Sequence, residues 1–318
     1  MISRKPILVT GSHRSGTTWV GKMLALSPSV GYIQEPFNPL DHRPGICSVK
    51  WEHWFYYVSP ENEAIFYEKI KDTVSLSYNL KEEFKIIISS KDALRMLKDY
   101  ITFEKYRISR TRPLLKDPIA LFSAEWLASK FNMDVVVMIR HPAAFAGSLK
   151  SKNWLMRFSE FLEQPLLMQD HLYSFETEMK EYEKRQPDVI DQAILLWKIM
   201  HHMIIKYQNK YKDWIFIRHE DISRESIVGF QTLFEKLDIE FSGSIKEEIK
   251  KYSSFKKSSE EAKNRLPFSL GRNLDYLKRD SRENIHNWKS RLTASEIERI
   301  RSGVESISSV FYSDADWE

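Results

Sequence analysis

The chain has 318 residues, of which 42% are apolar and 29% charged, and it contains a single cysteine. This length and composition exclude a largely disordered chain and favour one large globular domain spanning residues 1–318. The lone Cys47 excludes an internal disulfide framework and a Cys-x-x-Cys metal site, and it favours a reducing compartment. The net charge of +4 is too small to predict nucleic-acid binding, although it suits an anionic ligand.

The N-terminal stretch enters an apolar run at Pro6, which leaves no room for a signal peptide before it. No run of 18 apolar residues occurs in the sequence. We therefore expect a soluble, cytoplasmic protein with no transmembrane segment.

The first predicted elements form a strand, a glycine loop and a helix. Pro6–Thr10 is a short apolar run of the kind found in buried parallel strands. The helical pattern of Thr17–Ser27 follows and ends at Pro28, and Tyr32–Gln34 is a candidate second strand. Residues 36–60 are irregular and rich in aromatic side chains.

The remaining chain alternates predicted strands with predicted helices. The strands are expected at Leu114–Lys116, Asp134–Arg140 and Trp214–Arg218, and the helical segments at 61–107, Ala120–Phe131, His141–Leu149, 155–211, Ser226–Leu237 and 294–309. Residues 243–285 are polar and basic, and the charged run Lys250–Lys263 is typical of a solvated helix face. The alternation predicts a parallel sheet covered by helices on both faces.

The glycine loop reads Gly-Ser-His-Arg-Ser-Gly-Thr-Thr over residues 11–18. Its two glycines have P-loop spacing between a predicted strand and a predicted helix, which is the context that cradles phosphate. We therefore expect a P-loop-like, three-layer α/β/α fold with a central parallel sheet and helical insertions. Thr17 stands where a nucleoside triphosphatase has lysine, and Arg14 lies inside the loop, so the loop suits a 5′-phosphate that carries one transferable group.

A second anion site is predicted at the end of the strand Asp134–Arg140. Arg140 ends this strand, and Ser148 follows eight residues later within the next predicted helix. Arginine offers a fork of N–H donors that matches phosphate oxygens. Because ligands of open parallel sheets bind at the carboxyl ends of the strands, both motifs should meet one ligand.

The segment Arg-Ser-Gly-Thr-Thr-Trp, residues 14–19, resembles the 5′-phosphosulfate loop of the PAPS-dependent sulfotransferases, where PAPS is 3′-phosphoadenosine 5′-phosphosulfate. The spacing of Arg140 and Ser148 resembles the 3′-phosphate motif of the same superfamily. The resemblance implies an enzyme that uses PAPS and releases PAP. A sulfuryl group carries less charge than a phosphoryl group, and no dense carboxylate cluster stands beside the loop, so we expect no metal requirement. The resemblance assigns the donor nucleotide to Arg14, Ser15, Gly16, Thr17, Thr18, Arg140 and Ser148. It also implies that Arg14 neutralises charge on the leaving oxygen or the sulfuryl group.

A base is needed to take the proton of the acceptor hydroxyl. Glu35, in Tyr-Ile-Gln-Glu-Pro-Phe, is similar to the glutamate of Golgi-type carbohydrate sulfotransferases, and tyrosylprotein sulfotransferases have a comparable one. Lys116, in Leu-Leu-Lys-Asp-Pro, resembles the lysine that approaches the transferring group in the tyrosylprotein enzymes. His13, His42 and His53 are alternative bases that match no motif of the family.

Two further regions give less specific signals, and only the second of them rests on the resemblance. Aromatic residues are candidates for the acceptor cleft: Trp51, Trp54, Phe55, Tyr56, Tyr57 and Trp154. The C-terminal stretch 279–293 is similar to the region that closes over the 3′-phosphate, without its usual glycines, which makes Arg265, Arg282 and Lys289 candidate contacts. A mobile basic lid is the alternative interpretation of this stretch.

The predicted function is sulfuryl transfer to a saccharide, a glycolipid or a small hydroxylated metabolite. A P-loop kinase is the alternative enzyme, although it would be expected to have lysine at position 17 and to need Mg²⁺. A non-catalytic protein that binds nucleotide anions is the alternative from another class. It would bind PAP without turnover and would be indifferent to the loss of Glu35.

Overall fold

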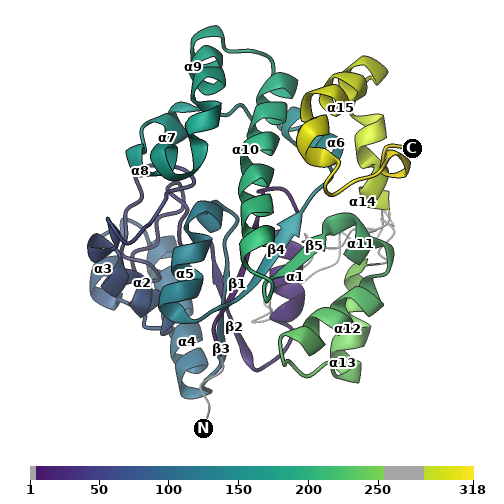
Figure 1. Ribbon diagram of the computed structural model, residues 1–318. Coiled ribbons are helices and arrows are strands. Elements are labelled where there is room, and N and C mark those ends of the chain that lie inside the picture. Colours follow the sequence, from purple (N-terminus) through teal and green to yellow (C-terminus); the bar gives the residue numbers. More distant parts are fainter. Residues whose placement is uncertain (1–4, 254–282) are drawn as a thin grey trace.

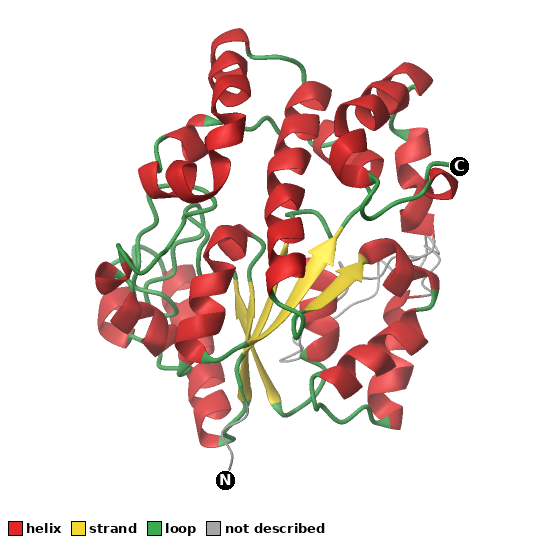
Figure 2. Cartoon of the chain, in the orientation of Figure 1, coloured by secondary structure: helices red, strands yellow, loops and turns green. Residues whose placement is uncertain are grey.

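The computed structural model describes residues 5–253 and 283–318 (Figure 1). Within these residues, parallel strands form a central sheet in the order β2-β3-β1-β4-β5. The strands are β1 (Ile7–Gly11), β2 (Val30–Gln34), β3 (Arg112–Lys116), β4 (Asp134–Ile139) and β5 (Ile215–Arg218). Because every pairing is parallel, the carboxyl ends of the strands share one edge of the sheet (Figure 2).

Helices connect the strands and extend the fold beyond the sheet. The α-helices are α1 (Thr17–Leu24), α2 (Tyr67–Val74), α3 (Leu80–Phe84), α4 (Ser90–Ile108), α5 (Ala124–Phe131), α6 (Pro142–Lys150), α7 (Ser159–Leu162), α8 (Pro165–Leu167), α9 (Glu176–Arg185), α10 (Val189–Lys210), α11 (His219–Arg224), α12 (Ser226–Lys236), α13 (Gly243–Ser253), α14 (Glu283–His286) and α15 (Ala294–Ser308). Short 3-10 segments include η2 (Ile119–Ser123), η7 (Asn287–Ser290) and η8 (Asp314–Asp316). Among the described residues, no helix is both long and apolar enough to cross a membrane.

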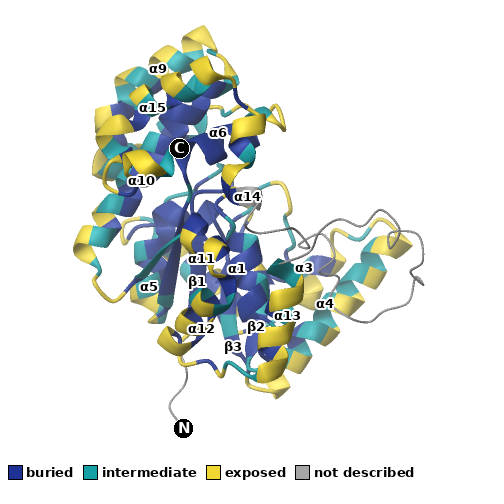
Figure 3. Cartoon of the chain, turned by 90° about the vertical axis from the view of Figure 1, so that its right-hand side faces the viewer, coloured by how far each residue is buried: buried dark blue, intermediate teal, exposed yellow. Residues whose placement is uncertain are grey.

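The sheet is buried on both faces, which gives the three layers that the sequence predicts. Along β4, Val135 and Val137 enter one apolar cluster, shared with α5, α6 and α10. Val136 and Met138 enter a second cluster, shared with α1 and α12. Figure 3 shows mostly buried residues in the central strands, and helices in which buried, intermediate and exposed residues alternate. The prediction of an α/β fold with a central parallel sheet is confirmed.

The C-terminal helix approaches the carboxyl edge of the sheet from outside the central layers. α15 contacts both α6 and α10, and η7 contacts α6. Figure 1 shows α15 beside the N-terminal part of the long helix α10, above the strand ends. Residues near the C-terminus therefore lie close to the helix that carries Ser148.

Several predicted boundaries need correction. The first helix ends at Leu24 rather than Ser27, because residues 25–27 form turns in which Leu26 N–H binds the Met23 carbonyl at 3.1 Å. β2 begins at Val30, two residues earlier than predicted, since Val30 pairs with Arg112 of β3. The predicted helix face at 250–263 is described only as far as Ser253, and the rest lies outside the described residues.

Candidate active site

The glycine loop after β1 folds so tightly that two of its positions require glycine. Gly11 has a φ of 130°, and a Cβ there would lie 2.2 Å from the carbonyl oxygen of Met138 on β4. Gly16 precedes α1 with a φ of 92°, and a Cβ there would lie 2.4 Å from Nδ1 of His219. The loop therefore directs the N-terminus of α1, with its unpaired amide donors, to the carboxyl edge of the sheet.

The two predicted phosphate motifs meet beside this helix end. Arg14, with a φ of 65°, donates from Nε to the Ser148 hydroxyl at 3.0 Å. Arg140 reaches the backbone carbonyl of Arg14 from the end of β4, at 3.5 Å. Residues more than 120 positions apart in the chain are thereby brought together, because β4 pairs directly with β1.

This arrangement concentrates positive charge in a partly buried place. The Arg140 side chain is only 14% exposed. Burial lowers the pKa of Arg140, and the nearby charges of Arg14 and Arg291 lower it further, whereas Glu220 opposes the change. An anion bound here would relieve the repulsion between the guanidinium groups, in addition to receiving their hydrogen bonds.

The donors present fit the phosphates of a nucleotide such as PAPS. The N-terminus of α1 and the two guanidinium groups lie at one strand edge, and Thr17 and Thr18 open the helix. The Ser12 hydroxyl in the loop is buried and has no hydrogen-bond partner among the described residues. Buried hydroxyl groups normally form a hydrogen bond, so the lack of a partner for Ser12 is consistent with a ligand that supplies one.

The predicted base and the predicted lysine touch one another on the other side of β1. Nζ of Lys116 donates to Oε1 of Glu35 in an ion pair. The contact arises because β2 and β3 pair in register at their ends, and the Glu35 N–H also donates to the Lys116 carbonyl at 2.9 Å. Asn38 donates to the other carboxylate oxygen of Glu35 at 3.0 Å. The lysine side chain is 1% exposed and the glutamate side chain 22%, so the carboxylate is the more accessible member of the pair.

Asp117 fixes the backbone around this pair. Its carboxylate accepts the N–H of Phe37 at 2.7 Å, just after the turn at Glu35. The other oxygen accepts the N–H groups of Ile119 and Ala120 at the start of η2. Asp117 therefore joins the segment after Glu35 to the start of η2.

The three histidines considered as alternative bases lie in different surroundings. His13 is buried in the loop among Phe55, Phe145 and Trp154. Burial and the charge of Arg14 lower the pKa of His13 to about 3, which makes it a weak base at neutral pH. Nδ1 of His53 lies 3.6 Å from Glu160, and burial lowers the pKa of His42.

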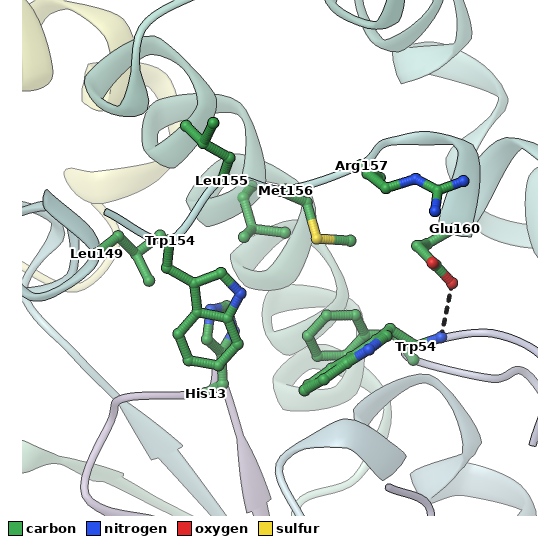
Figure 4. Close-up of a pocket in the computed structure, with 10 residues that line it drawn as sticks. His13, Trp54, Leu149, Trp154, Leu155, Met156, Arg157 and Glu160 are labelled. Atoms are coloured by element: carbon green, nitrogen blue, oxygen red, sulfur yellow. Dashed lines mark hydrogen bonds between the residues drawn. The ribbon is translucent and has the colours of Figure 1, made fainter. Parts of the chain in front are cut away.

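An aromatic cavity of about 100 Å³ opens beside the glycine loop (Figure 4). It is mostly apolar, with a basic and an acidic side chain in its wall, and is lined by His13, Trp54, Phe55, Leu149, Trp154, Leu155, Met156, Arg157, Glu160 and Leu196. Three of the predicted cleft aromatics line it. Trp51, Tyr56 and Tyr57 do not: Trp51 is buried, stacked on Phe37 with ring centroids 4.1 Å apart.

The C-terminal candidates are only partly described. Arg265 and Arg282 lie outside the described residues, and Lys289 is exposed on η7, with Nζ 5.5 Å from the centre of the Trp288 ring. Two residues that sequence reasoning missed act on Arg140 electrostatically, namely Arg291 and Glu220. For Glu220 the missed signal was the predicted strand Trp214–Arg218, because residues that follow a parallel strand end belong to the ligand edge. Arg291 lies within the stretch 279–293, in which other basic residues were the predicted contacts.

Metal binding and thiol chemistry can also be considered for this chain. Residues 5–253 and 283–318 contain no group of three His, Cys, Asp or Glu side chains placed to hold a metal ion. Cys47 is buried, and burial raises the pKa of its thiol to about 11. A thiol in that environment is a poor nucleophile.

Several solved structures are similar to the chain at low identity. The sulfotransferase domain of the Synechococcus PCC 7002 olefin synthase is 11% identical, with 99% of this chain and 98% of that chain covered and a TM-score of 0.48. The sulfotransferase domain from the curacin biosynthetic pathway is 15% identical, with 95% and 99% covered and a TM-score of 0.48. Mouse sulfotransferase SULT7A1 complexed with PAP is 12% identical, with 98% and 87% covered and a TM-score of 0.44.

Comparison with curated protein sequences finds no match. Comparison with protein families gives a match to the Sulfotransferase family over residues 6–243, which is more than half of the chain and includes the glycine loop, Glu35, Lys116, Arg140 and Ser148. The chain therefore belongs to the sulfotransferase family, and the expectation that it is a PAPS-dependent enzyme of this kind is confirmed at the level of the family.

Proposed function

We propose that the enzyme transfers a sulfuryl group from PAPS to a hydroxyl of a saccharide, a glycolipid or a small hydroxylated metabolite, in one domain and in the cytoplasm. The observation that carries the donor assignment is the hydrogen bond from Arg14 to Ser148, which joins the two phosphate motifs. In this proposal Ser15, Gly16, Thr17 and Thr18 hold the 5′-phosphosulfate. Arg140 and Ser148 hold the 3′-phosphate, with Arg282 as a further candidate contact.

PAPS supplies an activated sulfuryl group, whose sulfur forms a bond to the acceptor oxygen as the bond to the 5′-phosphate oxygen breaks. Glu35 accepts the proton of the acceptor hydroxyl at its carboxylate, which is partly exposed at the strand edge. Lys116 holds this carboxylate in place and brings positive charge to the reacting centre. Arg14 stabilises the charge that develops on the leaving oxygen. None of these steps requires a metal ion.

Two observations support the proposed subtype and acceptor. A glutamate base paired with a lysine favours the carbohydrate or tyrosylprotein type of sulfotransferase over the histidine type. The cavity beside His13 is narrow and apolar, with Trp54 and Trp154 as its aromatic walls (Figure 4). Aromatic faces bind flat or apolar groups, so we propose that an apolar or aromatic part of the acceptor enters this cavity.

The donor class is tested by calorimetric titration of the purified protein with PAP and with ATP, each in EDTA and in Mg²⁺. We expect PAP to bind in EDTA at least about tenfold more tightly than ATP, because the loop lacks the lysine that contacts β- and γ-phosphates. Turnover of PAPS should likewise be unaffected by EDTA. Binding of ATP that needs Mg²⁺ and exceeds that of PAP would favour the kinase alternative, and PAP binding without turnover would favour the non-catalytic one.

The cavity is tested by Trp154→Ala. Wild-type protein loaded with PAP should bind a phenyl glycoside more tightly than the free sugar, and the variant should lose about tenfold in affinity for the phenyl glycoside only. The Trp154 ring lies 5.2 Å from that of His13 and 5.9 Å from that of Trp54, so its loss opens the cavity. Tyr173→Ala is the matched control, because Tyr173 is 75% exposed and does not line the cavity. If wild type and Trp154→Ala preferred the phenyl glycoside over the free sugar to the same extent, the proposed role of the cavity in acceptor binding would be contradicted.

A further inference from the structure

Glu220 is a buried carboxylate at the start of α11, directly after β5, and the mechanism above does not use it. Its side chain is 4% exposed. Oε1 lies 3.5 Å from Nε of Arg140 and accepts the backbone N–H of His141 at 3.1 Å. Oε2 accepts the phenol of Tyr312 at 3.0 Å. One carboxylate thus contacts the end of β4, the residue before α6 and the C-terminal segment.

The contact with His141 links Glu220 to Ser148 as well as to Arg140. His141 is the residue that precedes α6, and Ser148 lies on that helix. Arg140 and the start of α6 are therefore held by the same oxygen of Glu220. Glu220 thus contacts Arg140 directly, whereas it reaches the helix of Ser148 only at the residue before its start.

Tyr312 holds Glu220 from the opposite side. Burial and the adjacent Glu220 raise the pKa of Tyr312, so its phenol keeps its proton and donates it to the carboxylate. The guanidinium of Arg218 lies 4.5 Å from the centre of the Tyr312 ring. Arg218 also binds the Phe311 carbonyl at 3.0 Å and pairs with Asp316 of η8. Through these contacts, Arg218 at the end of β5 binds the C-terminal segment that carries Tyr312.

We propose that Glu220, held by Tyr312, is a positioning residue that orients Arg140 toward the 3′-phosphate and so sets the preference of the enzyme for 3′-phosphorylated donors. The inference rests on the proposed function, since it assumes that Arg140 binds this phosphate. Glu220 itself would not touch the nucleotide. A carboxylate beside a phosphate-binding arginine restricts the guanidinium to one orientation, and a preorganised fork loses less freedom when the ligand binds.

The test compares PAP with 5′-AMP, which differ by the 3′-phosphate. Calorimetry should show that wild-type protein binds PAP more tightly than 5′-AMP. Glu220→Gln keeps the size of the side chain and removes its charge. We expect it to weaken PAP binding about tenfold and 5′-AMP binding less than about twofold, because 5′-AMP does not use Arg140. Tyr312→Phe should weaken PAP binding about threefold in the same selective way.

A double-mutant cycle separates positioning from general support of the fold. In an Arg140→Ala background, Glu220→Gln should cause no further selective loss of PAP affinity, because it acts through Arg140. Glu181→Gln is the matched control: Glu181 pairs with Arg185 within α9, and its change should leave both affinities as in wild type. If Glu220→Gln does not fold, Tyr312→Phe and its cycle with Arg140→Ala decide the question.

Two results would overturn the inference while leaving the proposed function intact. One is equal weakening of PAP and 5′-AMP binding in Glu220→Gln, which would indicate a purely structural contribution. The other is unchanged PAP affinity in both variants. A wild-type protein that does not discriminate PAP from 5′-AMP would instead overturn the assignment of the 3′-phosphate site, and this inference with it.

Discussion

Glu35→Gln is expected to lower kcat for sulfuryl transfer by about 10²- to 10⁴-fold, while the affinity for PAP stays within about twofold of wild type. The amide is nearly isosteric with the carboxylate but cannot accept the proton of the acceptor hydroxyl. It can still receive the hydrogen bond from Lys116, so the backbone around the pair should be retained. Single-turnover measurements with PAPS and a saturating acceptor report the chemical step directly, and calorimetry reports PAP binding.

A second glutamate-to-glutamine variant controls for the loss of one negative charge in Glu35→Gln. Glu68 pairs with Lys71 at 3.0 Å, and its side chain is 74% exposed, so Glu68→Gln removes a lysine-paired glutamate away from the strand edge. It should leave the single-turnover rate unchanged. If Glu35→Gln retained a rate within about threefold of wild type, Glu35 could not be the base, because the contribution of a general base is far larger.

The Glu35–Lys116 contact shows which features of the site could be predicted from the sequence and which could not. Both residues could be chosen separately, from the motif around each and from their position after a predicted strand. Glu35 and Lys116 are 81 residues apart along the chain, and their contact depends on the pairing of Gln34 with Lys116 across β2 and β3. Local patterns predict that strands exist, but neighbouring positions in a sheet are decided by packing over the whole chain.

The same argument explains why Glu220 was missed. The strand Trp214–Arg218 was predicted, and β5 occupies Ile215–Arg218. Because β5 pairs with β4, the residues that follow β5 lie beside Arg140. The sequence around residues 219–220 does not indicate that Arg140 is their neighbour. The C-terminal partner Tyr312 is further still, at 92 residues from Glu220 along the chain.

Aromatic composition predicted the acceptor cavity only in part. Trp54 and Trp154 line it, whereas Trp51 belongs to the core, where its indole N–H donates to the Pro36 carbonyl at 2.7 Å. All three have the same residue type, and two of them lie in the same irregular stretch of sequence. Which of them is buried depends on long-range contacts of the loop, such as the bond from Trp54 N–H to Glu160 at 2.9 Å.

Arg140→Ala is expected to weaken PAP binding by about 10- to 100-fold, since hydrogen bonds to charged groups contribute about 1.5–3 kcal/mol each. Binding of 5′-AMP should fall much less, because the amide donors at the start of α1 remain when the Arg140 side chain is removed. Arg140→Lys keeps the charge without the planar fork, so it should recover only part of the PAP affinity. Calorimetry with both ligands measures these differences.

The buried position of Arg140 requires one further control. Removing Arg140 leaves Glu220 buried without its cationic neighbour, and a lone buried charge destabilises a fold by several kcal/mol. Thermal unfolding of each variant without ligand therefore accompanies the titrations, and the double variant Arg140→Ala with Glu220→Gln should be more stable than Arg140→Ala alone. If PAP affinity were lost in Arg140→Ala but fully restored in the double variant, the loss would stem from the stranded carboxylate. The 3′-phosphate would then have to bind elsewhere, with Arg291 as the next candidate because its charge also reaches this place.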